Sequence, residues 1–198
     1  MFTPPSDARS MLATELSKSP QEEGKVLVKK LALLGTMLAM VLVAVAPAFG
    51  QMAPPEGVQS FWVLTQYHTT EPVLYEQIPP VGGDHDPVLQ NCGFYEEPVR
   101  NENAVHSLEH GAVWITYSPD LPADQVEALR ALASGHTHML VSPYPGLPTP
   151  VVASAWGEQL WLEEAYDPRL EQFVGAFEQG PQNPEPGAPC SGGIGEPQ

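Results

Sequence analysis

One run of almost wholly apolar residues, from Leu31 to Phe49, limits what this chain can fold into, because such a stretch belongs in a membrane. The run is about 19 residues long, near the minimum for a helix that spans a bilayer. Lys25, Lys29 and Lys30 precede it, and a basic flank keeps the N-terminus in the cytoplasm. We therefore expect residues 1–30 to form a cytoplasmic tail and the chain after residue 50 to fold outside the cytoplasm.

Residues 31–49 can be a retained transmembrane anchor or the apolar core of a cleaved signal peptide. Ala46-Pro47-Ala48 and Ala48-Phe49-Gly50 both have the small-x-small form of a cleavage site. The preceding tail is long for a signal peptide, although a start at Met11 would shorten it. We predict a single-pass cell-membrane protein, with a secreted or periplasmic form after cleavage as the alternative.

The part of the chain predicted to be exported is acidic. After residue 50 it contains 20 Asp and Glu residues, three Arg and no Lys. Such a surface repels nucleic acid and anionic lipid headgroups, and it attracts cations, including metal ions. We therefore predict no nucleic-acid partner and membrane contact only through the N-terminal helix, while the sequence identifies no protein partner.

The remaining pattern divides into a linker at residues 50–58, a folded domain at 59–180 and an extended Pro/Gly-rich tail at 181–198. Strands are predicted at Ser60–Gln66, Val73–Ile78, Ala112–Tyr117, His138–Ser142, Val151–Trp156 and Gln159–Leu162, and helices at Pro122–Ser134 and from Asp167 to Gly180. This mixture favours an α+β fold with two helices packed on a small, mostly antiparallel sheet, preceded by the one N-terminal hydrophobic helix. A thioredoxin-like sheet has a compatible element order, but the chain has no Cys-x-x-Cys to supply thioredoxin chemistry.

Two cysteines, Cys92 and Cys190, lie far apart in the sequence. An exported domain is in an oxidising compartment, where such a pair forms a disulfide. The bond would tie the Pro/Gly-rich tail to the domain. The rival interpretation is a pair of thiolates that bind a soft metal, although neither cysteine has a second cysteine close to it.

His106 and His110 stand four residues apart, with Glu109 between them. If residues 103–110 form a short helix, the two imidazoles lie on one face, one turn apart. Two imidazoles in that geometry can hold one metal ion, but further ligands must come from elsewhere.

The best upstream ligand is His85, which follows the flexible pair Gly82-Gly83 and can be aimed by a tight turn. His68 is the candidate fourth ligand. We therefore predict a copper or zinc site formed by His68, His85, His106 and His110, with Glu109 in a supporting role.

Three alternatives stay open. The segment His136-Thr137-His138-Met139 offers two imidazoles and a thioether, a set that suits copper. In a non-enzymatic interaction or structural module, the histidines would only form a buried polar cluster with Glu109, Asp84 or backbone carbonyls. Residues 106–110 also spell the H-x-x-E-H pattern of some zinc hydrolases. That chemistry needs a long helix, whereas Gly111 and a strand follow at once, so we predict no catalytic residue.

These motifs resemble those of a bacterial family, domain of unknown function 3105 (DUF3105). The matching residues are His68, Tyr75, Pro79-Pro80-Val81-Gly82-Gly83-Asp84-His85, Gly93-Phe94-Tyr95, Val105 to Gly111, Trp156-Gly157 and Pro184-Glu185. The resemblance covers roughly residues 60–190 and implies a short cytoplasmic tail, one hydrophobic segment and one exported domain. Gly82 departs from the pattern, which usually has Ser there. The family brings no established activity, so function must come from the residues.

Overall fold

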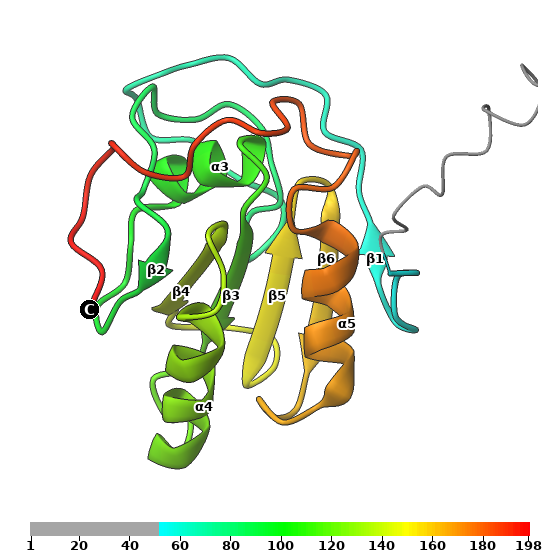
Figure 1. Ribbon diagram of the computed structural model, residues 1–198. Coiled ribbons are helices and arrows are strands. Elements are labelled where there is room, and N and C mark those ends of the chain that lie inside the picture. Colours follow the sequence, from blue (N-terminus) through cyan, green and yellow to red (C-terminus); the bar gives the residue numbers. More distant parts are fainter. Residues whose placement is uncertain (1–51) are drawn as a thin grey trace, which may run out of the picture. The chain divides into compact units, whose positions relative to one another are not determined.

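The computed structural model describes residues 52–198 (Figure 1). The predicted cytoplasmic tail and apolar run, together with the start of the linker, lie outside the described residues. Within residues 52–198, no helix is both long enough and apolar enough to span a membrane.

A six-stranded sheet forms the centre of the domain. Its strands are β1 (Gln59–Ser60), β2 (Gly93–Phe94), β3 (Val113–Tyr117), β4 (Met139–Pro143), β5 (Val151–Ala155) and β6 (Glu158–Leu162). They lie in the order β1-β6-β5-β3-β4-β2. The β2–β4 and β3–β4 pairs are parallel, and the β3–β5, β5–β6 and β1–β6 pairs are antiparallel.

The predicted α+β class is confirmed, but the prediction of a mostly antiparallel sheet is wrong, because the sheet is mixed. The cause is helix α4 (Ala123–Ala133), which returns the chain from the end of β3 to the start of β4. A helical crossover of this length produces parallel neighbours, whereas a short turn, such as the one between β5 and β6, produces antiparallel ones. This βαβ unit followed by a hairpin is compatible with the thioredoxin-like alternative.

Three helices cover the two faces of the sheet. Helices α4 and α5 (Pro168–Phe177) lie on one face, in front of the strands in Figure 1. The signals that predicted α5 hold, since the Asp167 side chain accepts a hydrogen bond from the Arg169 amide at 2.9 Å and Pro168 begins the helix.

Helix α3 (Asn101–Glu109) packs on the other face. Alternation along β3 sends Ile115 toward α4 and α5 and sends Trp114 toward α3, where it joins Val105 and Leu108. All four side chains are fully buried. Truncating a buried leucine such as Leu108 to Ala costs about 2–5 kcal/mol, so packing fixes α3 firmly against the sheet.

The segment from residue 61 to 78 differs from its prediction. Ser60–Gln66 and Val73–Ile78 were expected as strands, but only Ser60 belongs to one. Val63 and Tyr75 are partly buried against the apolar cluster that contains Val105 and Leu108, yet beyond Ser60 neither stretch belongs to a strand of the sheet. Side chains help to hold this backbone, since the Tyr67 and Val73 amides donate to Asp84 Oδ1 and Glu102 Oε1.

The Cys92–Cys190 disulfide is present, with the two Cα atoms 5.4 Å apart, so that prediction is confirmed. The Cys92 amide also donates to the Cys190 carbonyl at 2.9 Å. The bond fixes the C-terminal segment, drawn in red in Figure 1, where it passes alongside α3.

Candidate metal centre

His106 in α3 and His110, which directly follows α3, point toward each other, as the four-residue spacing predicts. Their ring centroids are 4.6 Å apart, and their Nε2 atoms are 3.0 Å apart. Gly111, just beyond the end of α3, has φ +99°, a conformation that favours glycine. A Cβ there would lie 3.1 Å from both Gln179 Cα and Asn183 Nδ2, so this glycine also lets the chain after α5 approach α3.

His85 reaches the same place from the turn after Gly83, which has φ +117°. The Tyr75 hydroxyl donates to the Asp84 carbonyl at 2.7 Å and fixes the turn. The His85 ring is fully buried, with its centroid 5.0 Å from that of His106 and an edge-on contact to Trp156. The predicted convergence of a glycine-freed turn on α3 therefore occurs.

His68 completes the group of rings. Its backbone forms an isolated bridge with His85, in which the Thr69 amide donates to the His85 carbonyl at 2.7 Å. The His68 ring lies 5.0 Å from the His85 ring and 5.2 Å from the His106 ring. Its side chain is 54% exposed, so His68 lies between the buried rings and solvent.

Glu109 lies among these histidines. Its Oε2 atom is 3.0 Å from His85 Nε2 and 4.0 Å from His68 Nε2. The side chain is almost fully buried. The sequence interpretation placed Glu109 in a supporting role, whereas the structure places its carboxylate among the possible ligand atoms.

The donor atoms form two sets. His68, His85, His106 and Glu109 each offer one atom, and these atoms all lie within 4.8 Å of one another. Glu109, His110 and Glu185 form a second set by the same measure. The four predicted histidines therefore gather around Glu109, with His110 on the side of Glu185.

Three of the rings are oriented by backbone carbonyls. Nδ1 lies 2.9 Å from the Gly83 oxygen in His85, 2.7 Å from the Asp86 oxygen in His106 and 2.8 Å from the Pro189 oxygen in His110. A carbonyl oxygen only accepts hydrogen bonds, so each Nδ1 carries the proton. In the neutral ring Nε2 is then bare, which is the tautomer of a metal-binding histidine whose other nitrogen is held by a second group.

The bare nitrogens face other electron-rich atoms. His85 Nε2 faces the Glu109 carboxylate, and His106 Nε2 faces His110 Nε2. Among the described residues, His85 Nε2 is a buried nitrogen with no hydrogen-bond partner. Such an atom costs about 1–3 kcal/mol when it stays unsatisfied. A cation between these atoms would remove that cost.

Charged neighbours support the ring of His106. Arg100 pairs with Asp86 at 2.7 Å and with Glu102 at 2.9 Å beside α3. Burial would raise the pKa of Asp86, but the Val88 amide and Arg100 outweigh it and lower that pKa. The Asp86 carboxylate thus stays ionised and paired with Arg100. This pair fixes Asp86, whose backbone carbonyl accepts the hydrogen bond from His106 Nδ1.

The pKa of His106 is lowered, first by burial and then by His110, His85 and His68, although the hydrogen bond to Asp86 opposes this. A lowered pKa keeps the imidazole neutral to a lower pH than that of a free histidine. Neutral imidazole is the form that binds metals.

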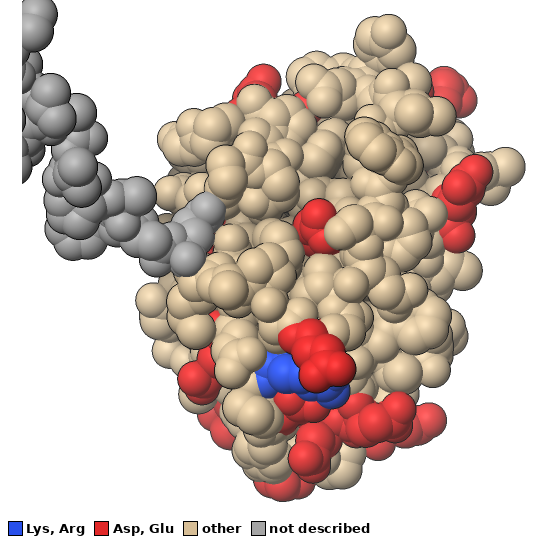
Figure 2. Space-filling model, turned by 90° about the vertical axis from the view of Figure 1, so that its right-hand side faces the viewer, with Lys and Arg blue, Asp and Glu red and all other residues tan. Residues whose placement is uncertain are grey.

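The surface of the domain favours cations. Arg100, Arg130 and Arg169 each form an ion pair with a carboxylate, so their charges are locally matched. Most of the 20 acidic residues in residues 52–198 therefore have no arginine partner within that described part of the chain. Figure 2 shows acidic side chains spread over one face, with basic side chains at a single place. Such a field raises the local concentration of metal ions.

The alternative copper set is not brought together. His136 Nδ1 lies 2.6 Å from Glu178 Oε2, and His138 Nε2 lies 2.9 Å from the Ala188 carbonyl. Met139 begins β4 and is buried in the core on the side of α4 and α5. The His138 ring, which directly precedes β4, instead contacts Gln179 and the Ala188 carbonyl.

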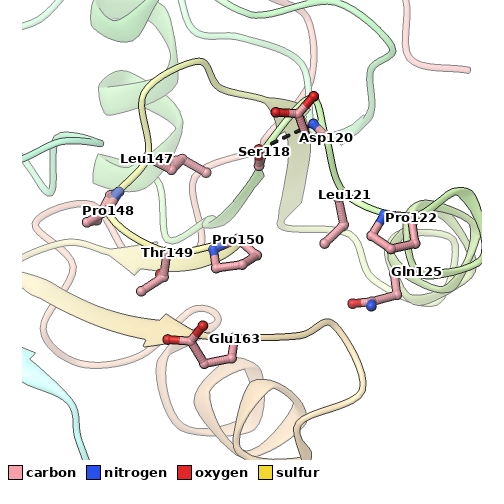
Figure 3. Close-up of a pocket in the computed structure, with 10 residues that line it drawn as sticks. All are labelled: Ser118, Asp120, Leu121, Pro122, Gln125, Leu147, Pro148, Thr149, Pro150 and Glu163. Carbon is pink, nitrogen blue, oxygen red and sulfur yellow. Dashed lines mark hydrogen bonds between the residues drawn. The ribbon is translucent and has the colours of Figure 1, made fainter.

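A pocket elsewhere on the domain has different chemistry. It lies between the loop after β3 and the loop at residues 147–150, where Asp120, Gln125 and Glu163 contribute polar groups (Figure 3). No histidine lines it. This pocket is thus separate from the cluster formed by His68, His85, His106 and His110.

The sequence interpretation did not assign Glu185, or the carbonyls of Asp86 and Pro189, to this site. Glu185 belongs to the Pro-Glu motif of the resemblance, and that motif was its one signal. The roles of the two carbonyls depend on backbone geometry, which side-chain types do not encode.

A family model described as a protein of unknown function (DUF3105) matches residues 66–192. That range contains all four predicted histidines, Glu109, Glu185 and both cysteines. No curated protein and no solved structure matches the chain.

Proposed function

This chain belongs to the DUF3105 family, and we propose that its folded domain binds a transition-metal ion through His68, His85, His106 and Glu109. One observation carries the proposal. The buried His85 Nε2 is bare and has no hydrogen donor, yet it lies 3.0 Å from a carboxylate oxygen. A metal ion is the partner that both atoms can bind at once.

The donor set favours zinc(II) or copper(II). Three imidazoles and one carboxylate form a ligand set of intermediate softness, and four donors suit a tetrahedral zinc ion. Copper(I) prefers thiolates and thioethers, and neither is among these four residues. His68 is the most exposed ligand, so we assign it the entry side of the site.

The same proposal places the domain outside the cytoplasm, attached through residues 31–49. Lys25, Lys29 and Lys30 before the apolar run support this orientation. The Cys92–Cys190 disulfide is typical of an oxidising compartment. An exported copper or zinc binder is thus the role that we infer.

The second candidate is a non-enzymatic module with a polar cluster and no metal. A protonated His85 could form an ion pair with Glu109 at their separation of 3.0 Å. The zinc hydrolase has less support, because α3 ends at Glu109 and that carboxylate already faces two imidazoles.

Metal analysis separates the two main candidates. The full chain is purified in detergent without a nickel column or chelator, its metal content is measured, and zinc(II) and copper(II) are titrated calorimetrically. We expect stoichiometric binding at this site, and His85→Ala should abolish binding of the ion held there. His136→Ala, which removes a histidine outside the cluster, should bind like the parent. Failure of the parent to bind either ion would reject the metal proposal and favour the polar cluster.

A further inference from the structure

We infer that a second divalent cation binds beside the first, held by Glu109, His110 and Glu185, with Glu109 shared between the two ions. This inference rests on the proposed function and extends it from one ion to a pair. It begins from the two donor sets, which have Glu109 in common.

His110 is not in the set formed by His68, His85 and His106 with Glu109. Ligands of one tetrahedral zinc ion, bound at about 2.0–2.1 Å, must all lie close to one another. An ion centred in the first set therefore leaves His110 outside its ligands. His110 belongs instead with Glu185, whose Oε2 lies 3.4 Å from His110 Nε2.

The free nitrogen of His110 needs a positive partner. Its Nδ1 donates to the Pro189 carbonyl, so Nε2 is bare in the neutral ring. That Nε2 faces His106 Nε2 at 3.0 Å and the Glu185 carboxylate at 3.4 Å. His110 is nine-tenths buried, so bulk water does little to satisfy this atom.

The backbone fixes Glu185 beside α3. Its amide donates to the Glu109 carbonyl at 3.2 Å, and its carbonyl accepts from the Ala188 amide at 3.2 Å. The segment then continues to Pro189, which orients His110, and to Cys190 in the disulfide. The Glu185 side chain is 57% exposed, which leaves room for water as a further ligand.

The second set contains one imidazole and two carboxylates, a harder group than the first. It suits zinc(II), manganese(II) or iron(II) better than a soft copper ion. Glu109 has two carboxylate oxygens, one for each ion, and paired metal ions in proteins lie about 3.5–4 Å apart. A negatively charged bridge would also reduce the repulsion between two cations.

Counting zinc ions tests the inference. The full chain in detergent is saturated with zinc(II), separated from free zinc and analysed for metal, with calorimetric titration as a second count. We expect two ions per chain for the parent and one for Glu185→Gln. The control, Glu171→Gln, removes the same charge from the exposed surface of α5 and should keep two ions.

Each other outcome has a defined meaning. One ion in the parent, unchanged in Glu185→Gln, would overturn the second site and leave the first intact. Two ions in Glu185→Gln, or an equal loss in Glu171→Gln, would also overturn it, because zinc would then be bound elsewhere. No zinc in the parent would overturn the second zinc site, and failure to bind copper(II) as well would reject the proposed function itself.

Discussion

The carbonyl oxygen of Pro189 lies 2.8 Å from Nδ1 of His110, and the next residue, Cys190, is bonded to Cys92. The disulfide therefore holds the backbone that sets the tautomer and direction of one ring. The Cys92–Cys190 bond and the orientation of the His110 ring are thus linked through one peptide step, from Cys190 to Pro189.

Loss of the disulfide should reduce both stability and zinc binding. The bond closes a loop with a sequence separation of 98. The chain-entropy model gives about 4.7 kcal/mol for a loop of roughly 100 residues. We expect Cys92→Ser/Cys190→Ser to lower the free energy of unfolding by about 2–5 kcal/mol in urea titrations. An unchanged unfolding midpoint would contradict this expectation.

The zinc affinity of the same double variant should fall mainly at the ion that needs His110 and Glu185. Calorimetry under conditions in which the variant is folded should then show one zinc ion bound with reduced affinity and one bound with nearly the parent's affinity. An equal loss of affinity for both ions would instead indicate a general loss of structure.

Metal affinity should depend on pH through the imidazoles. A proton competes with the metal for Nε2, so affinity is full above the pKa values of the ligands and falls as the pH is lowered through them. An unperturbed histidine has a pKa of about 6.5. The pKa of His106 is lowered by burial, so this ligand resists protonation to a lower pH than an unperturbed histidine does.

We therefore expect little change in zinc affinity between about pH 8 and 7, and a decline below about pH 6.5 as protons compete. Titrations in several buffers would count the protons taken up as zinc leaves. Affinity that is constant down to about pH 5 would mean that carboxylates alone hold the ion, because their unperturbed pKa values are about 4.

Gly111→Ala should destabilise the domain more than Gly146→Ala. Both glycines have positive φ, +99° and +80°, so alanine is strained at each by roughly 1–2 kcal/mol. A Cβ at Gly111 would also press on Gln179 and Asn183 at 3.1 Å, whereas Gly146 has no heavy atom within 4 Å. Equal changes in the free energy of unfolding would show that the approach of the chain after α5 to α3 is unimportant.

A reporter enzyme fused after Gln198 should be active only when it reaches the outside of the cytoplasm. The basic residues before Leu31 motivate this expectation. Replacing Lys25, Lys29 and Lys30 with Glu should reduce export of the reporter, while loss of Arg9 and Lys18 should matter less. Reporter activity inside the cytoplasm would contradict the predicted topology.

Much of the local structure could be predicted from sequence. The Asp167-Pro168 cap signals predicted α5, and the strand predicted at Ala112–Tyr117 corresponds to β3, which begins one residue later and is fully buried. The segment at residues 61–78 is rich in aromatic and branched residues, which favour strands, yet it belongs to no strand of the sheet. Pairing depends on partners far away in sequence, which periodicity does not reveal.

The candidate site was predictable in part for similar reasons. The spacing of His106 and His110 fixes their common direction, and the same helical rule places Glu109 near His106, three residues away. Its sequence position next to His110 indicates a different direction from the helix, which predicts only a supporting role for Glu109. Glu185 approaches His110 because the chain after α5 passes alongside α3, and no local pattern encodes that contact.

X-ray absorption at the zinc edge, on the zinc-loaded full chain, tests the central claim most directly because it reads the ligands themselves. We expect a shell of nitrogen and oxygen donors at about 2.0–2.1 Å with clear scattering from imidazole rings. That imidazole contribution should decrease in His85→Ala and stay unchanged in His136→Ala. A shell of oxygen donors alone, or a spectrum that His85→Ala leaves unaltered, would contradict a histidine metal centre in this protein.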